Sequence, residues 1–234
     1  MSKGKLEGRV ILITGATGTL GTAASRAAAR QGAHVVLLGR TISKLEKLYD
    51  AIMAHGGPEP AIYPLDLMGA SEQDYADLAT SLEQDMGGLD GVLHCAAELG
   101  HLAPLAEQDG QRWQRLLHIN LTAPCLLTRA VIPLLLRAQQ GTAVFVGDSA
   151  VADGKAYWGA YGVAKIGLAG YARILNEELE ALGVRSQLFT PGPMRSPIRL
   201  RAYTGESAEL LPSVEQPAER IVELLVPSPI PTHP

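Results

Sequence analysis

Short apolar runs alternate with longer helical patterns along the chain, and this alternation constrains the fold more than any other feature. The expected strands cover 9–14, 34–38, 61–65, 91–96, 143–146 and 185–189. The expected helices cover 20–31, 42–55, 72–86, 112–136 and 160–182. Because the strands are continuously apolar, both faces of their sheet should be covered by helices. The sequence therefore predicts an α/β fold around a parallel sheet.

The composition indicates one globular domain, 1–234. The chain is 47% hydrophobic, which suffices for a sizeable core, and its formal net charge of −4 is spread over mixed signs. No basic block favours nucleic acid, and the N-terminus lacks the apolar region of a signal peptide. The apolar run 130–136 is short and contains Pro133, so no membrane span is expected. We therefore expect a cytoplasmic protein without nucleic-acid or membrane partners.

The sulfur and imidazole side chains do not indicate a metal site or a disulfide framework. Only Cys95 and Cys125 are present, which is typical of a reducing cytosol. The six histidines are scattered without metal-ligand spacing. His94 and Cys95 are neighbours, but adjacent side chains of a strand point to opposite faces.

A glycine-rich turn, Thr14-Gly-Ala-Thr-Gly-Thr-Leu-Gly21, joins the first strand to the first helix. Gly15 permits the tight turn, Gly18 lets the backbone approach a pyrophosphate, and Gly21 lets the helix pack closely on the sheet. A diphosphate would then lie at the helix N-terminus, on free amide donors. The residues expected to contact this cofactor are Gly15, Thr17, Gly18, Thr19, Leu20 and Gly21.

The end of the second strand favours NADP(H) over NAD(H). An NAD site of this type places an acid about 20 residues after the turn, to bind the ribose hydroxyls. This chain offers Leu38-Gly39-Arg40 and no acid. Arg40 can fork onto a 2′-phosphate, although it can also be a surface arginine that starts a polar helix with Lys44 and Lys47.

Two further strand ends are expected beside the cofactor. Asp66 and Leu67 end the third strand, where side chains can border an adenine; Asp66 can equally cap a helix or a loop. The fourth strand ends in small residues that include Ala96 and Ala97, which would let the cofactor lie over the strand tips.

Tyr161 and Lys165 stand four residues apart and share one helix face. A nearby ammonium lowers the pKa of a phenol, which could then serve as a general acid–base near neutrality. Such pairs also occur on solvated helix faces. Here, however, Lys165 is the only charge between 156 and 172, and a helix that is apolar all round is buried.

Two polar groups are placed to assist that phenol. Pro124 has no amide hydrogen, so the Asn120 carbonyl loses its partner and can hold a water, either in a local kink or in a proton path. Ser149 follows the fifth strand at the carboxyl edge, where ligands of such folds bind. Its hydroxyl could hold a substrate carbonyl oxygen. The polar segment 194–212 is a plausible lid, and 227–234 is a proline-rich tail.

Together these motifs resemble the single-domain branch of the short-chain dehydrogenase/reductase family, and most of all its bacterial reductases of unassigned substrate. The resemblance runs from about residue 10 to 196. It implies a Rossmann-type doubly wound sheet with strand order 3-2-1-4-5-6. It also implies general acid–base catalysis by Tyr161, assisted by Lys165, with both contacting the cofactor. Ser149 would orient the substrate carbonyl and the Asn120 carbonyl would hold a relay water. Pro191 and Gly192 would border the cofactor.

The chain departs from the family pattern in four places. Asp148 stands where the family places its serine, and a carboxylate there would repel developing alkoxide charge. Cys95-Ala-Ala97 replaces the family's Asn-Ala-Gly. Gly18 has the spacing of the sugar-epimerising branch, although that branch needs a larger substrate domain. The family's final strand is expected to be missing, because the chain stops soon after a helix near 218–225.

We therefore predict an NADP(H)-dependent oxidoreductase that interconverts a carbonyl and a secondary alcohol. The alternative is a non-catalytic NADP(H)-binding or sensing protein on the same fold. Helices 112–136 and 160–182 carry apolar residues on nearly every side. Both should therefore bury a second face against a partner chain. This pattern and the missing strand predict a homodimer rather than a tetramer.

Overall fold

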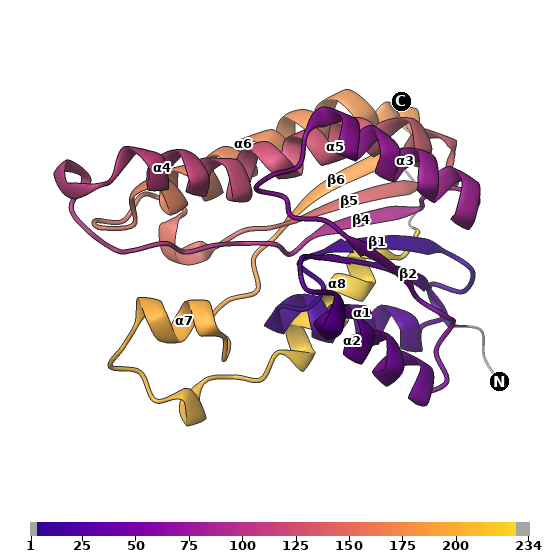
Figure 1. Cartoon of the computed structure of the whole chain (residues 1–234), viewed down its shortest axis with the longest axis horizontal. Helices are drawn as coiled ribbons and strands as arrows, with labels where there is room; N and C mark the ends of the chain where they lie inside the picture. The colour runs from indigo at the N-terminus through magenta and orange to yellow at the C-terminus, as the bar shows by residue number, and fades with distance from the viewer. Residues whose placement is uncertain (1–3, 228–234) are drawn as a thin grey trace.

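The computed structural model describes residues 4–227 as a six-stranded parallel sheet between two layers of helices (Figure 1). The sheet order is β3-β2-β1-β4-β5-β6, so the predicted order 3-2-1-4-5-6 and the Rossmann-type α/β fold are confirmed. The strands are β1 (Val10–Thr14), β2 (His34–Gly39), β3 (Ala61–Pro64), β4 (Gly91–His94), β5 (Gly141–Val146) and β6 (Val184–Phe189).

Alternate side chains of the central strands enter two separate cores. Ile11 and Ile13 of β1 pack with α1 (Thr19–Arg30), α2 (Ile42–Ala54) and α8 (Glu215–Leu225). On the opposite face, Leu12 packs with residues of α3 (Glu72–Met86), α5 (Ala123–Arg137) and α6 (Gly159–Leu179). The helices lie on both sides of the sheet in Figure 1. Because both faces are covered, only the strand ends remain open to a ligand.

The fourth strand ends two residues earlier than the sequence predicted. β4 stops at His94, and the chain then turns across the tip of β1. There the amide of Ala96 donates a hydrogen bond to the Thr14 hydroxyl at 3.3 Å. A backbone donor that bonds this side chain does not continue the strand ladder, so the small residues after β4 form a loop over the sheet edge.

The helix predicted at 112–136 is instead two α-helices joined by a π-turn. α4 (Gly110–Leu117) passes through the π-turn His118–Thr122 into α5. The amide of Ala123 donates to the carbonyl of His118, five residues earlier. The next residue, Pro124, has no amide hydrogen with which to restore the α-helical pattern to Asn120. The proline seen in the sequence therefore lies directly after a wider turn.

The combined stretch Gly110–Arg137 is long and apolar enough to cross a membrane, and half of its most apolar window is buried within the fold. We expected no such segment, because the run around Pro133 is short. The helix continues because Pro133 lies on the exposed side of α5, where water can pair the carbonyl that the proline leaves free. Burial of half the window is typical of a core helix that covers a sheet.

After β6 the chain forms α7 (Pro197–Ala202), a short 3-10 turn (Ala208–Leu210) and α8. Within 4–227 no strand follows α8. The segment expected to be a lid, 194–212, contains α7 and lies apart from the helical layers, beyond the carboxyl ends of the strands (Figure 1). All but the first residue of the proline-rich tail at 227–234 lies outside the described residues.

Candidate active site

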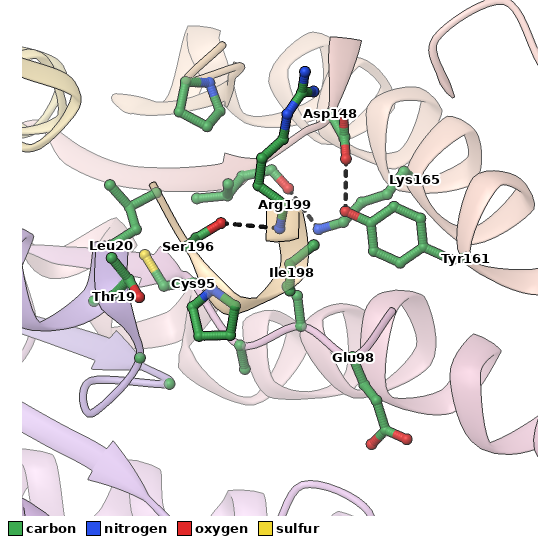
Figure 2. Close-up of a pocket in the computed structure, with 18 of the residues that line it drawn as sticks. Thr19, Leu20, Cys95, Glu98, Asp148, Tyr161, Lys165, Ser196, Ile198 and Arg199 are labelled. Carbon is green, nitrogen blue, oxygen red and sulfur yellow. Dashed lines mark hydrogen bonds between the residues drawn. The ribbon is translucent and has the colours of Figure 1, made fainter. Parts of the chain in front are cut away.

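A cavity of about 470 Å³ lies at the carboxyl edge of the sheet. Residues that follow β1, β2, β3, β4, β5 and β6 contribute to its wall. Every residue that the sequence predicted to contact the cofactor lines this cavity, including Arg40, Leu67 and Gly192. Figure 2 shows part of the wall, with Thr19 and Leu20 at one end and Tyr161 and Lys165 at the other.

The glycine-rich turn has the geometry that the sequence predicted, with one difference. Gly15 adopts φ +62°, and a Cβ there would lie 2.7 Å from the backbone of Ala96. A Cβ on Gly18 would meet only the Gly15 carbonyl, at 3.2 Å, so this turn leaves room for a ligand. Gly21 was expected to permit close packing on the sheet. Its Cβ would instead lie 2.2 Å from the Gly15 carbonyl, so Gly21 is needed by the turn itself.

The N-terminus of α1 can bind an anion. No side chain caps it, and its first turn contains no acidic residue. Its first amides and the positive end of the helix dipole therefore remain available to a phosphate. Arg40 lies at the same end of the cavity and is exposed, and no acid follows β2. This donor set fits a dinucleotide with an additional phosphate on its ribose.

The other strand ends beside this groove have local structural roles as well. Asp66 lines the cavity, and its Oδ1 accepts a hydrogen bond from the Met68 amide at 3.1 Å. The interpretation of Asp66 as a loop residue therefore describes its position, while its expected contact with an adenine stays a prediction. Gly192 after β6 adopts φ +72°, which a residue with a side chain adopts at a cost.

Tyr161 and Lys165 lie one turn apart on the buried face of α6. Their exposed fractions are 3% and 5%. The Lys165 Nζ donates to the Val146 carbonyl at 2.8 Å and lies 5.7 Å from the centroid of the Tyr161 ring. The interpretation of this pair as a solvated helix face is therefore excluded.

Asp148, and not Ser149, meets the phenol. The Tyr161 hydroxyl donates to Asp148 Oδ2 at 2.8 Å, as the dashed line in Figure 2 shows. Asp148 Oδ1 also accepts from the Ala150 amide at 2.9 Å, which caps the 3-10 turn Ser149–Val151. Ser149 begins that turn, and its side chain lines the cavity but is exposed.

The structure corrects the expected pKa of Tyr161. From the sequence we expected Lys165 to lower it. Burial, and then the charge and hydrogen bond of Asp148, raise the pKa of Tyr161 well above its ordinary value of 10.0. Burial also lowers the pKa of Lys165 to about 8, although Asp148 opposes this shift. The carboxylate accepts a hydrogen bond from the phenol and so favours its neutral form.

Asn120 stands behind the wall of the cavity. It is 1% exposed, and its side-chain amide donates to the carbonyls of Glu98 and Leu116 while its Oδ1 accepts from the Glu98 amide. Glu98 lines the cavity, and its carboxylate forms a two-pronged ion pair with Arg115. Asn120 therefore fixes the loop after β4. Pro124, four residues after Asn120, has no amide to donate to the Asn120 backbone carbonyl, and a relay water on that carbonyl stays a prediction.

The end of the cavity beside Tyr161 has an apolar wall that individual motifs did not identify. Trp158 and Tyr161 pack in one cluster with Ile198 and Tyr203, which come from the segment expected to be a lid. Lys155 Nζ donates to the Tyr203 hydroxyl at 2.8 Å. The only sequence signal for this wall was the length and polarity of 194–212, which does not specify its contacts.

Polar contacts also fasten this segment. Arg199 stacks on the Tyr203 ring at 3.6 Å and pairs with Glu206. Arg201 donates to the Gly100 carbonyl at 2.8 Å, which ties this segment to the loop after β4. The segment is therefore ordered by one aromatic cluster and several cation contacts.

Comparisons with known proteins agree with this geometry. A model of the short chain dehydrogenase family matches residues 9–206. The uncharacterized oxidoreductase YciK of Escherichia coli (strain K12) is 36% identical over 206 residues, which cover 88% of this chain and 81% of YciK. A short chain dehydrogenase structure from Pseudomonas syringae has a TM-score of 0.94 at 38% identity, and the match covers 99% of this chain and 94% of that one.

This chain therefore belongs to the short-chain dehydrogenase family. A further solved structure, a short chain dehydrogenase from Escherichia coli CFT073 complexed with NADPH, has a TM-score of 0.93 at 34% identity. That match covers 97% of this chain and 94% of the other. A similar protein from Shigella flexneri 2a str. 301 is complexed with NADP, with a TM-score of 0.93 and 34% identity over 97% of this chain and 94% of that one.

The buried Lys165 ammonium makes stability depend on pH. Its pKa falls from 10.5 to about 8 on folding. Between pH 8 and pH 10.5, Lys165 therefore holds its proton more fully in the unfolded chain than in the folded one. Stability therefore rises with pH across that window, by roughly 3 kcal/mol for this group. We expect Lys165→Met, which has no titrating group, to lack this contribution. Urea unfolding of both proteins from pH 7 to 10.5 measures the difference, and free energies that run parallel across this range would contradict the assignment.

Proposed function

We propose that the chain is an NADP(H)-dependent oxidoreductase that interconverts a carbonyl and a secondary alcohol. The observation that carries this proposal is the buried pair of Tyr161 and Lys165. This pair lies at one end of the cavity, and the glycine-rich turn lies at the other. We further propose that 1–234 is one catalytic domain in which 194–212 is the substrate lid. Two free cysteines, Cys95 and Cys125, are consistent with a cytosolic protein.

The cofactor would extend along the strand tips. Amides at the start of α1 would bind the diphosphate, and Arg40 would bind the 2′-phosphate of the adenosine ribose. Lys165 would bind the nicotinamide ribose, which puts the nicotinamide beside Tyr161. The NADP and NADPH complexes of the similar proteins support this choice of cofactor.

The chemistry follows from these positions. Bound NADPH supplies a hydride to the carbonyl carbon, and the electron pair of the C=O bond moves to oxygen. Tyr161 gives its phenolic proton to that oxygen, so an alcohol forms. Lys165 stabilises the phenolate that remains, and a water on the Asn120 carbonyl would return a proton from solvent. Ser149 would hold the substrate oxygen if the loop after β5 turned its hydroxyl inward. Alcohol oxidation uses the same steps in reverse.

A second candidate is an NADP(H)-binding protein without turnover. The hydrogen bond from Tyr161 to Asp148 favours it, because it holds the phenolic proton away from a substrate and raises the pKa of Tyr161. The two functions differ in turnover and not in cofactor binding.

We expect Tyr161→Phe to lower kcat by at least about a hundredfold, because it removes the proton donor and little packing. The Kd for NADPH should change less than about threefold, since the ring remains. NADPH oxidation over a panel of ketones and aldehydes, beside a fluorescence titration of NADPH, measures both. Substantial turnover by the Phe variant would exclude Tyr161 as the acid, and binding without any turnover by the native protein would favour the second candidate.

We expect Arg40→Ala to weaken the binding of NADPH by about 10- to 100-fold, the contribution of a charge-assisted hydrogen bond, and to leave the binding of NADH almost unchanged. The 2′-phosphate is the group that distinguishes the two cofactors. The ratio of the Kd for NADPH to the Kd for NADH therefore isolates its contribution. Lys44→Ala is a matched control, because it removes a neighbouring charge of α2 that does not line the cavity. Equal losses for NADPH and NADH would show that Arg40 is only a surface charge.

We propose a homodimer through helices 112–136 and 160–182. On α6, Val163, Ile166 and Ile174 are 49%, 42% and 60% exposed and form one apolar stripe along the helix. Sedimentation at micromolar concentration should give twice the chain mass of 24.8 kDa. Ile166→Glu together with Ile174→Glu should give a folded monomer, because the charges would meet their own copies across a two-fold axis. A native monomer would refute the proposed interface.

A further inference from the structure

The acid that meets Tyr161 gives the substrate end of the cavity an unusual electrostatic character. Asp148 is half-buried, lines the cavity and accepts hydrogen bonds from the Tyr161 hydroxyl and the Ala150 amide. Its two oxygens can accept about four hydrogen bonds in total. Capacity for a donor from a bound molecule therefore remains.

Asp148 also differs from the other acid at this end of the cavity. Glu98 is neutralised by Arg115 at 2.9 Å, and the Arg199 guanidinium is paired with Glu206. Among the described residues, no ion pair within 4.0 Å includes Asp148. Its carboxylate is therefore the negative charge that a substrate would meet beside the phenol.

A neutral ketone is a poor match for this arrangement. Its oxygen gains negative charge as the hydride arrives, and a carboxylate a few ångströms away opposes that charge. A simple ketone has no hydrogen-bond donor either. When Tyr161 turned its proton toward such a substrate, Asp148 would lose the hydrogen bond and gain nothing in return.

We propose that Asp148 selects carbonyl compounds that carry a protonated amino group on the adjacent carbon, and the corresponding amino alcohols in the reverse reaction. This inference rests on the proposed oxidoreductase function. The ammonium and the carbonyl oxygen of such a substrate lie on neighbouring carbons, so they can face Asp148 and Tyr161, whose bonded oxygens are 2.8 Å apart. The ammonium replaces the phenolic donor on Asp148, while the phenol donates to the carbonyl.

The same ammonium offsets the charge that develops in the reaction. The hydride forms the new C–H bond, the C=O electron pair moves to oxygen, and the Tyr161 proton completes the alcohol. The amino group keeps its protons throughout and lies between two negative oxygens, Asp148 and the incipient alkoxide. Trp158, Ile198 and Tyr203 pack together on the substrate side and would enclose an apolar substituent on the other carbon of the carbonyl.

The test uses three ketones that differ in one group: 2-amino-1-phenylethanone, 2-hydroxy-1-phenylethanone and 1-phenyl-1-propanone (propiophenone). They carry an ammonium, a hydroxyl and a methyl on the same carbon. With NADPH as reductant we expect kcat/KM for the amino ketone to exceed that for propiophenone by at least about tenfold, with the hydroxy ketone between them. Equal values for the amino ketone and propiophenone would overturn the proposal and leave the oxidoreductase function standing.

Variants at Asp148 locate the effect. Asp148→Asn and Asp148→Ser both retain an acceptor for the Ala150 amide, so the turn after β5 should fold. Both should bring the ratio of kcat/KM for the amino ketone to kcat/KM for propiophenone close to one. Asp148→Ser should also raise the activity on propiophenone. Glu98→Gln, which removes the paired carboxylate, should leave the ratio unchanged. A ratio that survives Asp148→Asn would overturn the proposal.

Binding separates this inference from the proposed function. The NADP⁺-loaded protein is titrated calorimetrically with 2-amino-1-phenylethanol and with 1-phenyl-1-propanol, its uncharged isostere. Tighter binding of the amine by at least about tenfold, lost in Asp148→Asn, supports the selection by Asp148 even if no ketone turns over, in which case the oxidoreductase function fails. Equal or absent binding of the two alcohols overturns the selection.

Discussion

The rest of this structure depends on the burial of both faces of a parallel sheet. Alternate side chains of β1 enter separate cores, so both faces of the sheet are covered and largely apolar. All six strands point the same way, and their carboxyl ends therefore meet along one edge. Polar residues such as Arg40, Asp66 and Asp148 lie along this edge, where they can remain hydrated. The cavity is thus a consequence of how the core is packed, and its chemistry is set by the residues that follow each strand.

At that edge, Asp148, Tyr161 and Lys165 behave as one electrostatic unit. Burial disfavours both the phenolate and the ammonium, so the pKa of Tyr161 rises and that of Lys165 falls to about 8. Asp148 opposes the shift of Lys165 and adds to that of Tyr161. A serine at position 148 would contribute no charge to either group. The identity of this one residue therefore adjusts the protonation of the other two, while burial remains the larger cause of each shift.

Much of this fold could be predicted from the sequence, because its signals are local. Apolar runs, the turn from Gly15 to Gly21, and a lysine within an apolar helix each restrict the backbone or its burial directly. The orientation of Asp148 and Ser149 could not be predicted, since it depends on the backbone of the turn between β5 and α6. The sign of the pKa shift of Tyr161 was also wrong. Spacing along a helix identifies Lys165 as a neighbour, but it gives no measure of the burial of the phenol, which is the larger cause, or of an acid from another element.

The π-turn His118–Thr122 places a further constraint on how this chain can change in evolution. It contains one residue more than an α-helical turn would, and that residue sets the rotation of α5 relative to α4. Deleting one residue here would rotate all of α5 by about 100°. Leu127 and Val131 would then leave the core beneath β4 and β5, while Asn120 could no longer hold the loop after β4. Insertions and deletions in this helix should therefore be rejected, so its length should vary less among descendants than its composition.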